Sequence, residues 1–362
     1  MSEQIMERKG EQPPEVLRLV DSQLRREWEE YQASGLPELI GGMHLCLVLD
    51  ALERTGVAER LRRGPAHPDQ LLQGLDAEIG GNLLRYLELK GAVASEEGRY
   101  RLTARGQLLM SPISLAQLGF YVAAYGPVIS ETARLLSGEL LYGRDVRRDT
   151  GALGRHSATM FHRFHTPTVL KALESVGTRV LLDLGCGGGQ LLIDACTLDR
   201  QLQGIGIDIA EDAIAYARRR AEEAGVSDRI QFFVADAFAP QSWPAACAGA
   251  DTICAVGMLH EPFRRGEDAV VEILDLYAGL LRGGTRRFIL GEPELRYDDR
   301  EHDSDFYLAH VLTAQGFPRS WEDWLPVIGR SRLSCRRLLM RPGAGQRLAF
   351  FELASGDGEA QA

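Results

Sequence analysis

The sequence predicts an α/β protein with a Rossmann-like, doubly wound, mostly parallel sheet in its C-terminal half and a mainly helical N-terminal half. Apolar residues before about residue 170 recur at helical spacing, whereas from Arg179 onward short β-rich runs alternate with longer helical patterns. Alternation of this kind places the strands in parallel, with right-handed crossovers and helices on both faces of the sheet.

The length of the chain indicates two domains. Its 362 residues exceed the ~250–300 residues at which a single hydrophobic core stops growing. We place a helical, winged-helix-like domain at residues 1–170 and the α/β domain at residues 171–355. The remaining residues, 356–362, are small or polar, and we expect them to be disordered.

The first domain contains a helix–helix–hairpin pattern. Pro68–Leu75 and Gly81–Leu89 favour helices, and the segments on either side of Glu96–Gly98 favour two short strands. This order is typical of winged-helix DNA-binding domains. Residues 51–105, however, carry nine basic and eight acidic side chains, which is too little positive charge for a DNA-binding face. A packing or dimerisation module is therefore the favoured interpretation.

The second domain contains seven candidate strands. The first five are Val180–Leu184, Gly204–Asp208, Ile230–Val234, Thr252–Val256 and Arg287–Gly291. Helical patterns follow three of them, at Gln190–Leu198, Glu211–Ala224 and Asp268–Leu281. The last two candidates, Arg336–Met340 and Gln346–Glu352, have no long helix between them and predict an antiparallel hairpin. The pattern as a whole predicts a seven-stranded, mostly parallel sheet.

Charge and composition exclude several classes of protein. With 41 basic and 51 acidic residues, the net charge of −10 argues against nucleic acid as a partner. We find no apolar run that approaches the ~18 residues of a membrane-spanning helix, and no export signal. The six cysteines form no C-x-x-C pair, as is usual for buried thiols in a reducing cytoplasm. We therefore expect a cytoplasmic protein that acts on small molecules.

A glycine-rich loop follows the first strand of the second domain, from Asp183 to Gly189. Gly185 and Gly187 let the backbone approach a ligand closely at the start of a helix. A nicotinamide or flavin fingerprint would need a further glycine at position 190, where the chain has Gln190. The carboxylate of Asp183 would also repel phosphates, so the loop suits a cationic ligand.

The segment Val180–Gly189 resembles motif I of the class I S-adenosylmethionine-dependent methyltransferases. Asp208, which ends the second strand, matches the acidic residue that accepts both ribose hydroxyls in that family. Asp236 matches the residue that contacts the adenine amino group, and Phe238 matches its apolar neighbour against the ring. The resemblance implies S-adenosylmethionine as the cofactor.

The resemblance extends over the whole chain, to small-molecule methyltransferases that resemble plant and bacterial O-methyltransferases. In that family the N-terminal domains interlock into a homodimer. The segment around His260 matches the family's leucine–histidine–aspartate loop, although Glu261 replaces the aspartate. The resemblance makes His260 a general base and Glu292, at the end of the fifth strand, the carboxylate that orients it. The segment 312–324 matches the part of the family that returns to the pocket.

A second histidine, His310, departs from the family pattern. It falls on a predicted helix one turn after Phe306, which we therefore also place in the substrate pocket. Paired with His260, it suits one metal ion such as iron or zinc. Two histidines resemble the metal site of the α-keto acid C-methyltransferases of peptide-antibiotic pathways. An ordinary helix histidine is the competing interpretation of His310. His162 and His165 lie on the helix that leads into the second domain and are both candidates to line the pocket; of the two we choose His162.

These observations predict an S-adenosylmethionine-dependent methyltransferase of small molecules. The preferred reaction is methylation at C3 of a metal-chelated α-keto acid in natural-product biosynthesis. The alternative is O-methylation of a phenolic or hydroxylated natural product, with His260 as general base. A nucleic-acid or protein methyltransferase is disfavoured, because no Asn-Pro-Pro-Tyr-type motif follows the fourth strand.

Overall fold

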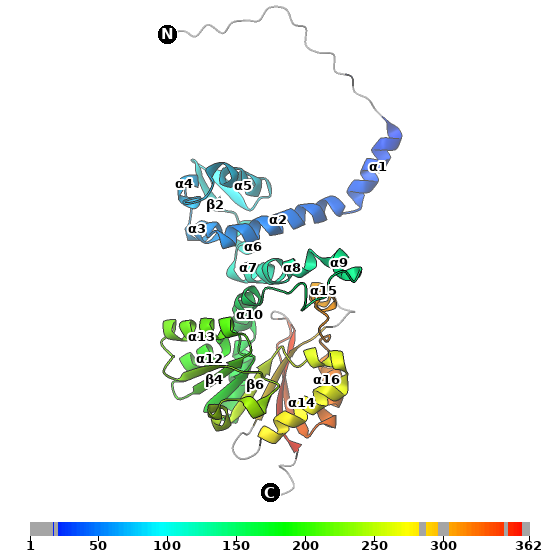
Figure 1. The fold of residues 1–362 in the computed structure, drawn as a ribbon. Helices are drawn as coiled ribbons and strands as arrows, with labels where there is room; N and C mark the ends of the chain where they lie inside the picture. The colour runs from blue at the N-terminus through cyan, green and yellow to red at the C-terminus, as the bar shows by residue number, and fades with distance from the viewer. Residues whose placement is uncertain (1–16, 18–20, 282–286, 296–303, 344–346, 357–362) are drawn as a thin grey trace, which may run out of the picture. The chain divides into compact units, whose positions relative to one another are not determined.

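The computed structural model describes residues 17, 21–281, 287–295, 304–343 and 347–356 (Figure 1). The chain divides into two compact units, residues 1–48 and 49–362, and each is described by itself. The expectation for the tail falls almost entirely on residues 357–362, which lie outside the described residues.

The first unit is helical. Helix α1 (Ser22–Ala33) begins at Asp21, whose carboxylate accepts hydrogen bonds from the backbone N–H groups of Gln23 and Leu24. Helix α2 (Leu36–Arg54) starts in this unit and has exposed apolar side chains at Leu39 and Met43.

The second unit begins with short helices and a hairpin in the predicted order. The helices are α3 (Val57–Arg63), α4 (Pro68–Leu71), α5 (Ala77–Leu89) and α6 (Ala104–Leu109). Between α5 and α6, strands β1 (Val93–Glu96) and β2 (Arg99–Leu102) pair antiparallel. The assignment of this region as a winged helix stays a prediction.

A further group of helices leads to the sheet. It comprises α7 (Pro112–Gly119), the π-helix η1 (Phe120–Tyr125), α8 (Gly126–Ile129), α9 (Thr132–Leu136), α10 (Thr150–Phe164) and α11 (Thr166–Val176). Single-turn π-helices are frequent at functional sites. Here Phe120 and Tyr125 belong to a buried cluster with Met160 of α10 and Ala309.

Part of this group forms a longer apolar stretch than the sequence analysis allowed for. Pro112–Ile129 is long and apolar enough to cross a membrane, and α1 with α2 would be a second candidate if that bent pair were one span. Leu115, Phe120 and Val128 of the first stretch are nevertheless buried inside the fold. We therefore interpret this stretch as a core helix.

The sheet confirms the predicted fold class. Its seven strands are β3 (Val180–Leu184), β4 (Gln203–Asp208), β5 (Ile230–Val234), β6 (Thr252–Val256), β7 (Arg287–Pro293), β8 (Leu333–Met340) and β9 (Leu348–Ser355). They are arranged in the order β5-β4-β3-β6-β7-β9-β8. The first five are parallel, and β8 and β9 are antiparallel, as the sequence predicts.

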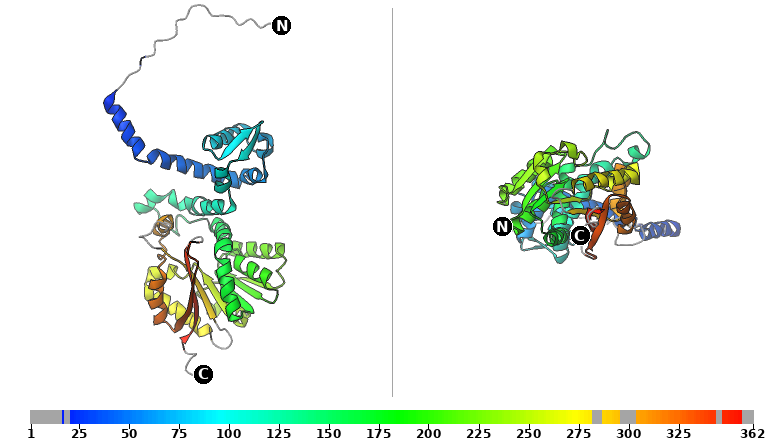
Figure 2. Two further views of the ribbon diagram at one scale, coloured as in Figure 1. Left: turned by 180° about the vertical axis from the view of Figure 1, so that it is seen from behind. Right: turned by 90° about the horizontal axis from the view of Figure 1, so that it is seen from below.

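Helices cover both faces of the sheet (Figure 2). On one face, α11, α12 (Gln190–Leu198) and α13 (Glu211–Glu223) pack on a core that includes Leu181 and Phe350. On the other, α14 (Glu267–Leu280) and α16 (Trp321–Arg330) pack on a core that includes Leu182 and Phe351. Consecutive residues point to opposite faces because side chains alternate along a strand.

The strand order fixes where a ligand can bind. From β3 the chain moves to β4 on one side, whereas β6 pairs with β3 on the other. Ligands of open α/β sheets bind at such a switch point, outside the carboxyl ends of the strands. Helix α15 (Ser304–Thr313) and the short helix η4 (Glu261–Arg265) lie beyond these strand ends and complete the site.

Candidate functional site

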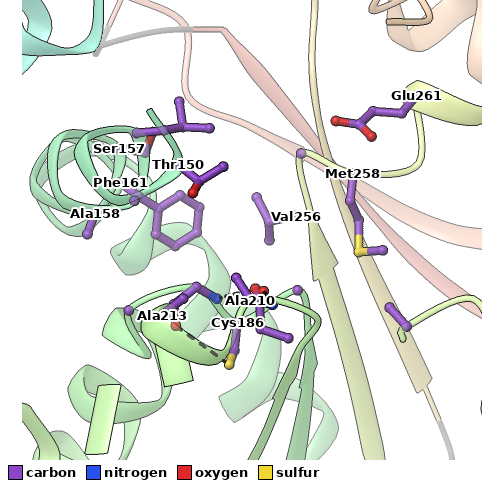
Figure 3. Close-up of a pocket in the computed structure, with 18 of the residues that line it drawn as sticks. Thr150, Ser157, Ala158, Phe161, Cys186, Ala210, Ala213, Val256, Met258 and Glu261 are labelled. Carbon is purple, nitrogen blue, oxygen red and sulfur yellow. Dashed lines mark hydrogen bonds between the residues drawn. The ribbon is translucent and has the colours of Figure 1, made fainter. Parts of the chain in front are cut away.

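A cavity of about 670 Å³ opens at the carboxyl ends of β3, β4 and β6. Figure 3 shows Thr150, Ser157, Ala158 and Phe161 of α10 on one side and Val256, Met258 and Glu261 on the other, with Cys186 below. Every residue that lines the cavity lies between Phe120 and Leu348.

The glycine loop forms one wall of this cavity. Gly185 and Gly187 have φ values of +65° and +51°, which side chains with a Cβ atom rarely adopt. Gly189, with φ at +73°, has no room for a Cβ atom because the ring of Phe232 would lie 2.7 Å away. The loop therefore brings its backbone to the cavity wall, as a close-binding ligand requires.

The Asp208 carboxylate stands at the end of β4 beside this loop. Its Oδ2 accepts a hydrogen bond from the Gly187 backbone N–H at 2.9 Å, and its Oδ1 accepts one from Ala210 at 2.8 Å. A carboxylate has about four acceptor sites, so both oxygens can still accept hydroxyl groups from a ligand. Such an arrangement suits the two adjacent hydroxyls of a ribose.

Asp183 lies deeper in the same wall and is 5% exposed. Burial, and then the nearby Asp208 carboxylate, raise the pKa of Asp183 to about 8. Both effects disfavour a second negative charge at this place. A cationic ligand in the cavity would favour the ionised form, which agrees with the sequence interpretation of the loop.

The third acidic residue, Asp236, follows β5. Its Oδ1 accepts a hydrogen bond from the backbone N–H of Phe238 at 2.9 Å, and both residues line the cavity. The cavity wall thus combines a carboxylate and an apolar ring at one end. Six residues predicted to bind the cofactor, namely Asp183, Gly185, Gly187, Asp208, Asp236 and Phe238, meet in this one cavity.

At the other end of the cavity, Glu292 holds His260. Glu292 is fully buried, and its carboxylate accepts hydrogen bonds from the backbone N–H groups of Met258, Leu259 and His260. Its Oε2 lies 2.7 Å from Nδ1 of His260. The carboxylate therefore fixes both the loop after β6 and the orientation of the imidazole ring.

His310 faces His260 from α15. Its Nδ1 lies 2.7 Å from the carbonyl oxygen of Phe306, and its Nε2 lies 3.3 Å from Nε2 of His260. The ring of Phe306 packs edge-on against His310, with centroids 4.4 Å apart. Burial, and then the charge of His260, lower the pKa of His310 to about 4. His310 is therefore neutral near pH 7.

The hydrogen-bond partners determine where the protons lie on these two rings. A carbonyl oxygen and a carboxylate can only accept, so Nδ1 carries the proton in both His310 and His260. In the neutral rings, both Nε2 atoms then direct lone pairs toward the 3.3 Å gap between them. Such an arrangement needs either an extra shared proton or a cation.

No third metal-binding side chain joins the pair: within the described ranges, the structure contains no cluster of three or more His, Cys, Asp and Glu residues suited to a metal. Glu261 lines the cavity, but its Oε1 accepts a hydrogen bond from Gln315 at 2.7 Å. The same oxygen lies 3.5 Å from the Arg148 guanidinium, which also donates to the Tyr125 hydroxyl.

The structure differs from the sequence expectation at His162. Its Nδ1 lies 2.6 Å from the Asp194 carboxylate, its side chain is 57% exposed, and it is absent from the cavity lining. Helix α10 instead brings His165, nearly one turn later, into the lining. Burial lowers the pKa of His165 to about 4, so this ring is also neutral. The two residues are three positions apart, and periodicity alone could not choose between them.

Several polar residues of the cavity were assigned no role in the sequence analysis, among them Arg148 and Gln315. Arg148 follows Arg144 and Arg147 in one loop, and nothing in the sequence distinguishes the arginine that turns inward. Gln315 falls within the segment 312–324, which was expected to return to the pocket. That segment does not single out Gln315, because six of its 13 residues are polar or charged.

Comparison with known proteins identifies the catalytic domain. The family model described as a methyltransferase domain matches residues 181–282. The uncharacterised protein YjhP of Escherichia coli K12 is 39% identical over 106 residues, which cover 25% of this chain and 41% of that protein. The 2-ketoarginine methyltransferase of Streptomyces arginensis is 26% identical over 292 residues, 76% of this chain and 81% of that enzyme.

Solved structures show the same fold. The mitomycin 7-O-methyltransferase MmcR superposes with a TM-score of 0.67 at 19% sequence identity. The match covers 92% of this chain and all of that one. The fold of the N-terminal region and of the sheet is therefore shared with a methyltransferase of a small molecule.

Proposed function

We propose that this class I S-adenosylmethionine-dependent methyltransferase transfers the methyl group of its donor to C3 of a metal-chelated α-keto acid. The observation that carries the proposal is the pair of imidazole nitrogens, Nε2 of His260 and Nε2 of His310, that face each other at 3.3 Å. The similarity to a 2-ketoarginine methyltransferase supports the same class of substrate.

The two histidines fit a metal ion. Two imidazole nitrogens that bind one ion at ~2.0–2.1 Å, with a near-tetrahedral angle, lie roughly 3.3–3.4 Å apart. Both Nδ1 atoms are hydrogen-bonded to an oxygen, which is the usual outer support of a metal-binding histidine. The donor set is two neutral nitrogens, which suits iron or zinc.

The residues at the two ends of the cavity would bind different molecules, the methyl donor at one end and the keto acid at the other. Asp208 would accept the ribose hydroxyls, and Asp236 with Phe238 would hold the adenine. At the other end, Arg148 offers a cation to the carboxylate of the keto acid, and the Glu261 carboxylate is 3.5 Å away from it. The rings of Phe120 and Phe306, with centroids 6.0 Å apart, exclude water from this end.

The reaction needs a carbon nucleophile at C3. A bound metal ion would supply Lewis acidity, which takes up negative charge as C3 loses its proton. The proton from C3 would pass to water. The C3 carbon would then attack the sulfonium methyl group, so that a carbon–carbon bond forms as the sulfur–methyl bond breaks and S-adenosylhomocysteine leaves. The buried Glu292 keeps the His260 ring in one tautomer and orientation throughout.

O-methylation of a phenol or other hydroxyl is the second candidate. The contact of 2.7 Å between Glu292 and Nδ1 of His260 favours it, because an oriented imidazole can remove a hydroxyl proton through Nε2. In that reaction, however, His310 would have no role, although it is buried and directed at the same atom.

Hydrogen exchange at C3 separates the two reactions. We expect an α-keto acid to exchange its C3 hydrogens in deuterated water when S-adenosylhomocysteine replaces the methyl donor, since enolisation does not need the methyl group. A phenol has no such hydrogen. Exchange should disappear in the His310→Ala variant and persist in the matched His162→Ala variant, whose histidine lies outside the cavity lining. Full activity of His310→Ala after exhaustive chelation would leave O-methylation as the better account.

A homodimer in the cytoplasm, acting in natural-product biosynthesis, completes the proposal. Leu39, Met43 and Leu47 form an exposed apolar stripe at i, i+4 and i+8 on α2. Exposed stripes of this kind usually pack against another chain. All six cysteines are free, as in proteins of a reducing compartment. Light scattering should give twice the mass of one chain, and Met43→Asp should lower it; a monomer mass at micromolar concentration contradicts the dimer.

A further inference from the structure

Glu261 is the acidic residue nearest in sequence to His260, and it lines the same cavity as both histidines. A free carboxylate beside two histidines completes a three-ligand metal site of the type found in iron oxygenases. The structure nevertheless keeps Glu261 out of such a cluster, since the described part of the chain contains no group of three metal-binding side chains.

Gln315 is what holds the Glu261 carboxylate. The Gln315 amide donates to Glu261 Oε1 at 2.7 Å, whereas Arg148 lies 3.5 Å from the same oxygen. The hydroxyl of Thr313, which is buried, lies 3.0 Å from Gln315 Oε1, but its one hydrogen also has the Ala309 carbonyl oxygen as an acceptor at 2.7 Å. An ionised carboxylate can only accept, so the contact with Glu261 assigns the amide nitrogen, and not the amide oxygen, to that side. The amide N–H therefore always faces Glu261.

The backbone fixes this contact as well. Gly316 packs directly on the loop after β6: a Cβ atom at this position would collide with the carbonyl oxygens of His260 and Glu261. The segment that contains Gln315 thus packs on the backbone of the two residues His260 and Glu261. The backbone next to Gln315 is therefore packed closely against the loop that carries His260 and Glu261.

We propose that Gln315 is a positioning residue that holds the Glu261 carboxylate away from the His260–His310 pair. The inference rests on the proposed function, because it concerns the metal that those histidines would hold. With Glu261 held aside, the site has two neutral ligands and no added negative charge. A third, anionic ligand would offset part of the charge of the cation and would weaken its hold on a chelating α-keto acid.

Metal affinity tests the proposal without any methyl transfer. The full-length chain is titrated with Zn²⁺ against a chromophoric chelator, for the native protein, Gln315→Leu, Glu261→Gln and the double variant. In Gln315→Leu the carboxylate is released toward the metal, so Zn²⁺ should bind about tenfold more tightly, in line with the 10–100-fold effects of outer-shell groups. Glu261→Gln and the double variant should bind Zn²⁺ equally, since neither has the carboxylate.

Substrate binding supplies the second readout. Calorimetry with α-ketobutyrate, a simple α-keto acid with hydrogens at C3, should show binding about tenfold weaker in zinc-loaded Gln315→Leu than in the zinc-loaded native chain, within the same range of outer-shell effects. The double variant should recover the affinity of Glu261→Gln. If Gln315→Leu does not fold, Gln315→Met keeps the length of the side chain without an amide donor and should shift both affinities in the same directions.

The outcomes separate this inference from the function on which it rests. A native chain that binds no metal overturns the proposed function and this inference together. Native metal binding with unchanged affinity in Gln315→Leu overturns this inference alone. This inference is also overturned if Gln315→Leu changes the Zn²⁺ affinity equally in the native chain and in the Glu261→Gln chain. Gln315 would then act only on the structure of the loop.

Discussion

The two ends of the cavity are built in different ways. At the end formed by β3, β4 and β5, the carboxylates of Asp208 and Asp236 accept hydrogen bonds from backbone groups within about 20 residues of themselves. At the other end, His260, Glu292 and His310 come from three separate segments and meet only in the folded chain. We call the first the donor end, because it would hold the methyl donor, and the second the acceptor end, because it would hold the methyl acceptor.

This difference determines which end of the cavity can change with the substrate. The donor end uses the loops after consecutive parallel strands, so its geometry follows from the sheet itself. The acceptor end depends on α15 and on the segment after it, which are not part of the sheet. Changes in substrate can therefore arise at the acceptor end while binding of the methyl donor is preserved.

The largest expected effect is at the histidine pair. His260→Ala or His310→Ala should remove the bound metal and lower turnover by at least about 10³-fold, since several kcal/mol of charge stabilisation disappear with the metal. Affinity for S-adenosylmethionine should be unchanged, because Asp208 and Asp236 are positioned by hydrogen bonds to Gly187, Ala210 and Phe238 and not by either ring. Elemental analysis and calorimetry on the same samples check both statements.

His162→Ala is the matched control, since this histidine binds Asp194 outside the cavity lining. A His310→Ala variant that keeps its metal, or that loses affinity for the methyl donor, would break the separation between the two ends.

The second effect is at the donor end. Asp208→Ala should weaken binding of S-adenosylmethionine by about 2–4 kcal/mol, because both ribose hydroxyls lose a charge-assisted partner. Metal content should not change. Calorimetry measures the loss, and Asp228→Ala, whose carboxylate is largely exposed, serves as the control. Unchanged donor affinity in a folded Asp208 variant would remove this site assignment.

The same difference explains how far the sequence could be interpreted. Five parallel strands and the loops after them were predicted within one or two residues, because period and turn residues are local signals. The acidic residues of the donor end lie in those loops. Their roles in binding the cofactor stay predictions.

The acceptor end was harder to predict. The placement of His310 beside His260 depended on a resemblance and on helical spacing, and both rings do line one cavity. Arg148 and Gln315 gave no local signal, since a side chain from a loop turns inward only because of tertiary packing. The choice between His162 and His165 had no sequence signal either, because a helix face alone does not show which residue lines the cavity.

A third, smaller effect is expected on folding stability when either of two glycines, one at each end of the cavity, is replaced by alanine. Gly189→Ala should clash with Phe232, and Gly316→Ala should clash with the backbone of His260 and Glu261. Each should lower the free energy of unfolding by about 1–3 kcal/mol. In the folded fraction, however, Gly189→Ala should weaken donor binding and Gly316→Ala should weaken metal binding. Denaturation curves with the two ligand titrations measure this; crossed effects would mean that the ends are coupled.

The smallest effect is a pH dependence at the donor end. Because burial and Asp208 raise the pKa of Asp183 from 3.8 to about 8, the folded chain keeps a proton that the unfolded chain loses above about pH 4. The contribution of this group to stability is therefore fully present below pH 4 and is lost as the pH rises toward 8. Relative to Asp183→Asn, the ligand-free native chain should lose about 1–2 kcal/mol between pH 6 and pH 8, since one proton corresponds to ~1.4 kcal/mol per pH unit and water in the cavity weakens the effect.

The methyl donor itself provides the control for this pH dependence. S-adenosylmethionine carries a sulfonium charge that S-adenosylhomocysteine lacks, and a cation favours the ionised Asp183. Affinity for S-adenosylmethionine should therefore rise between pH 6 and pH 8 by more than affinity for S-adenosylhomocysteine. The excess should vanish in Asp183→Asn, where no proton is released on binding. Calorimetry in two buffers of different ionisation enthalpy counts that proton, and an equal count for both ligands would show that the buried carboxylate does not sense the sulfonium group.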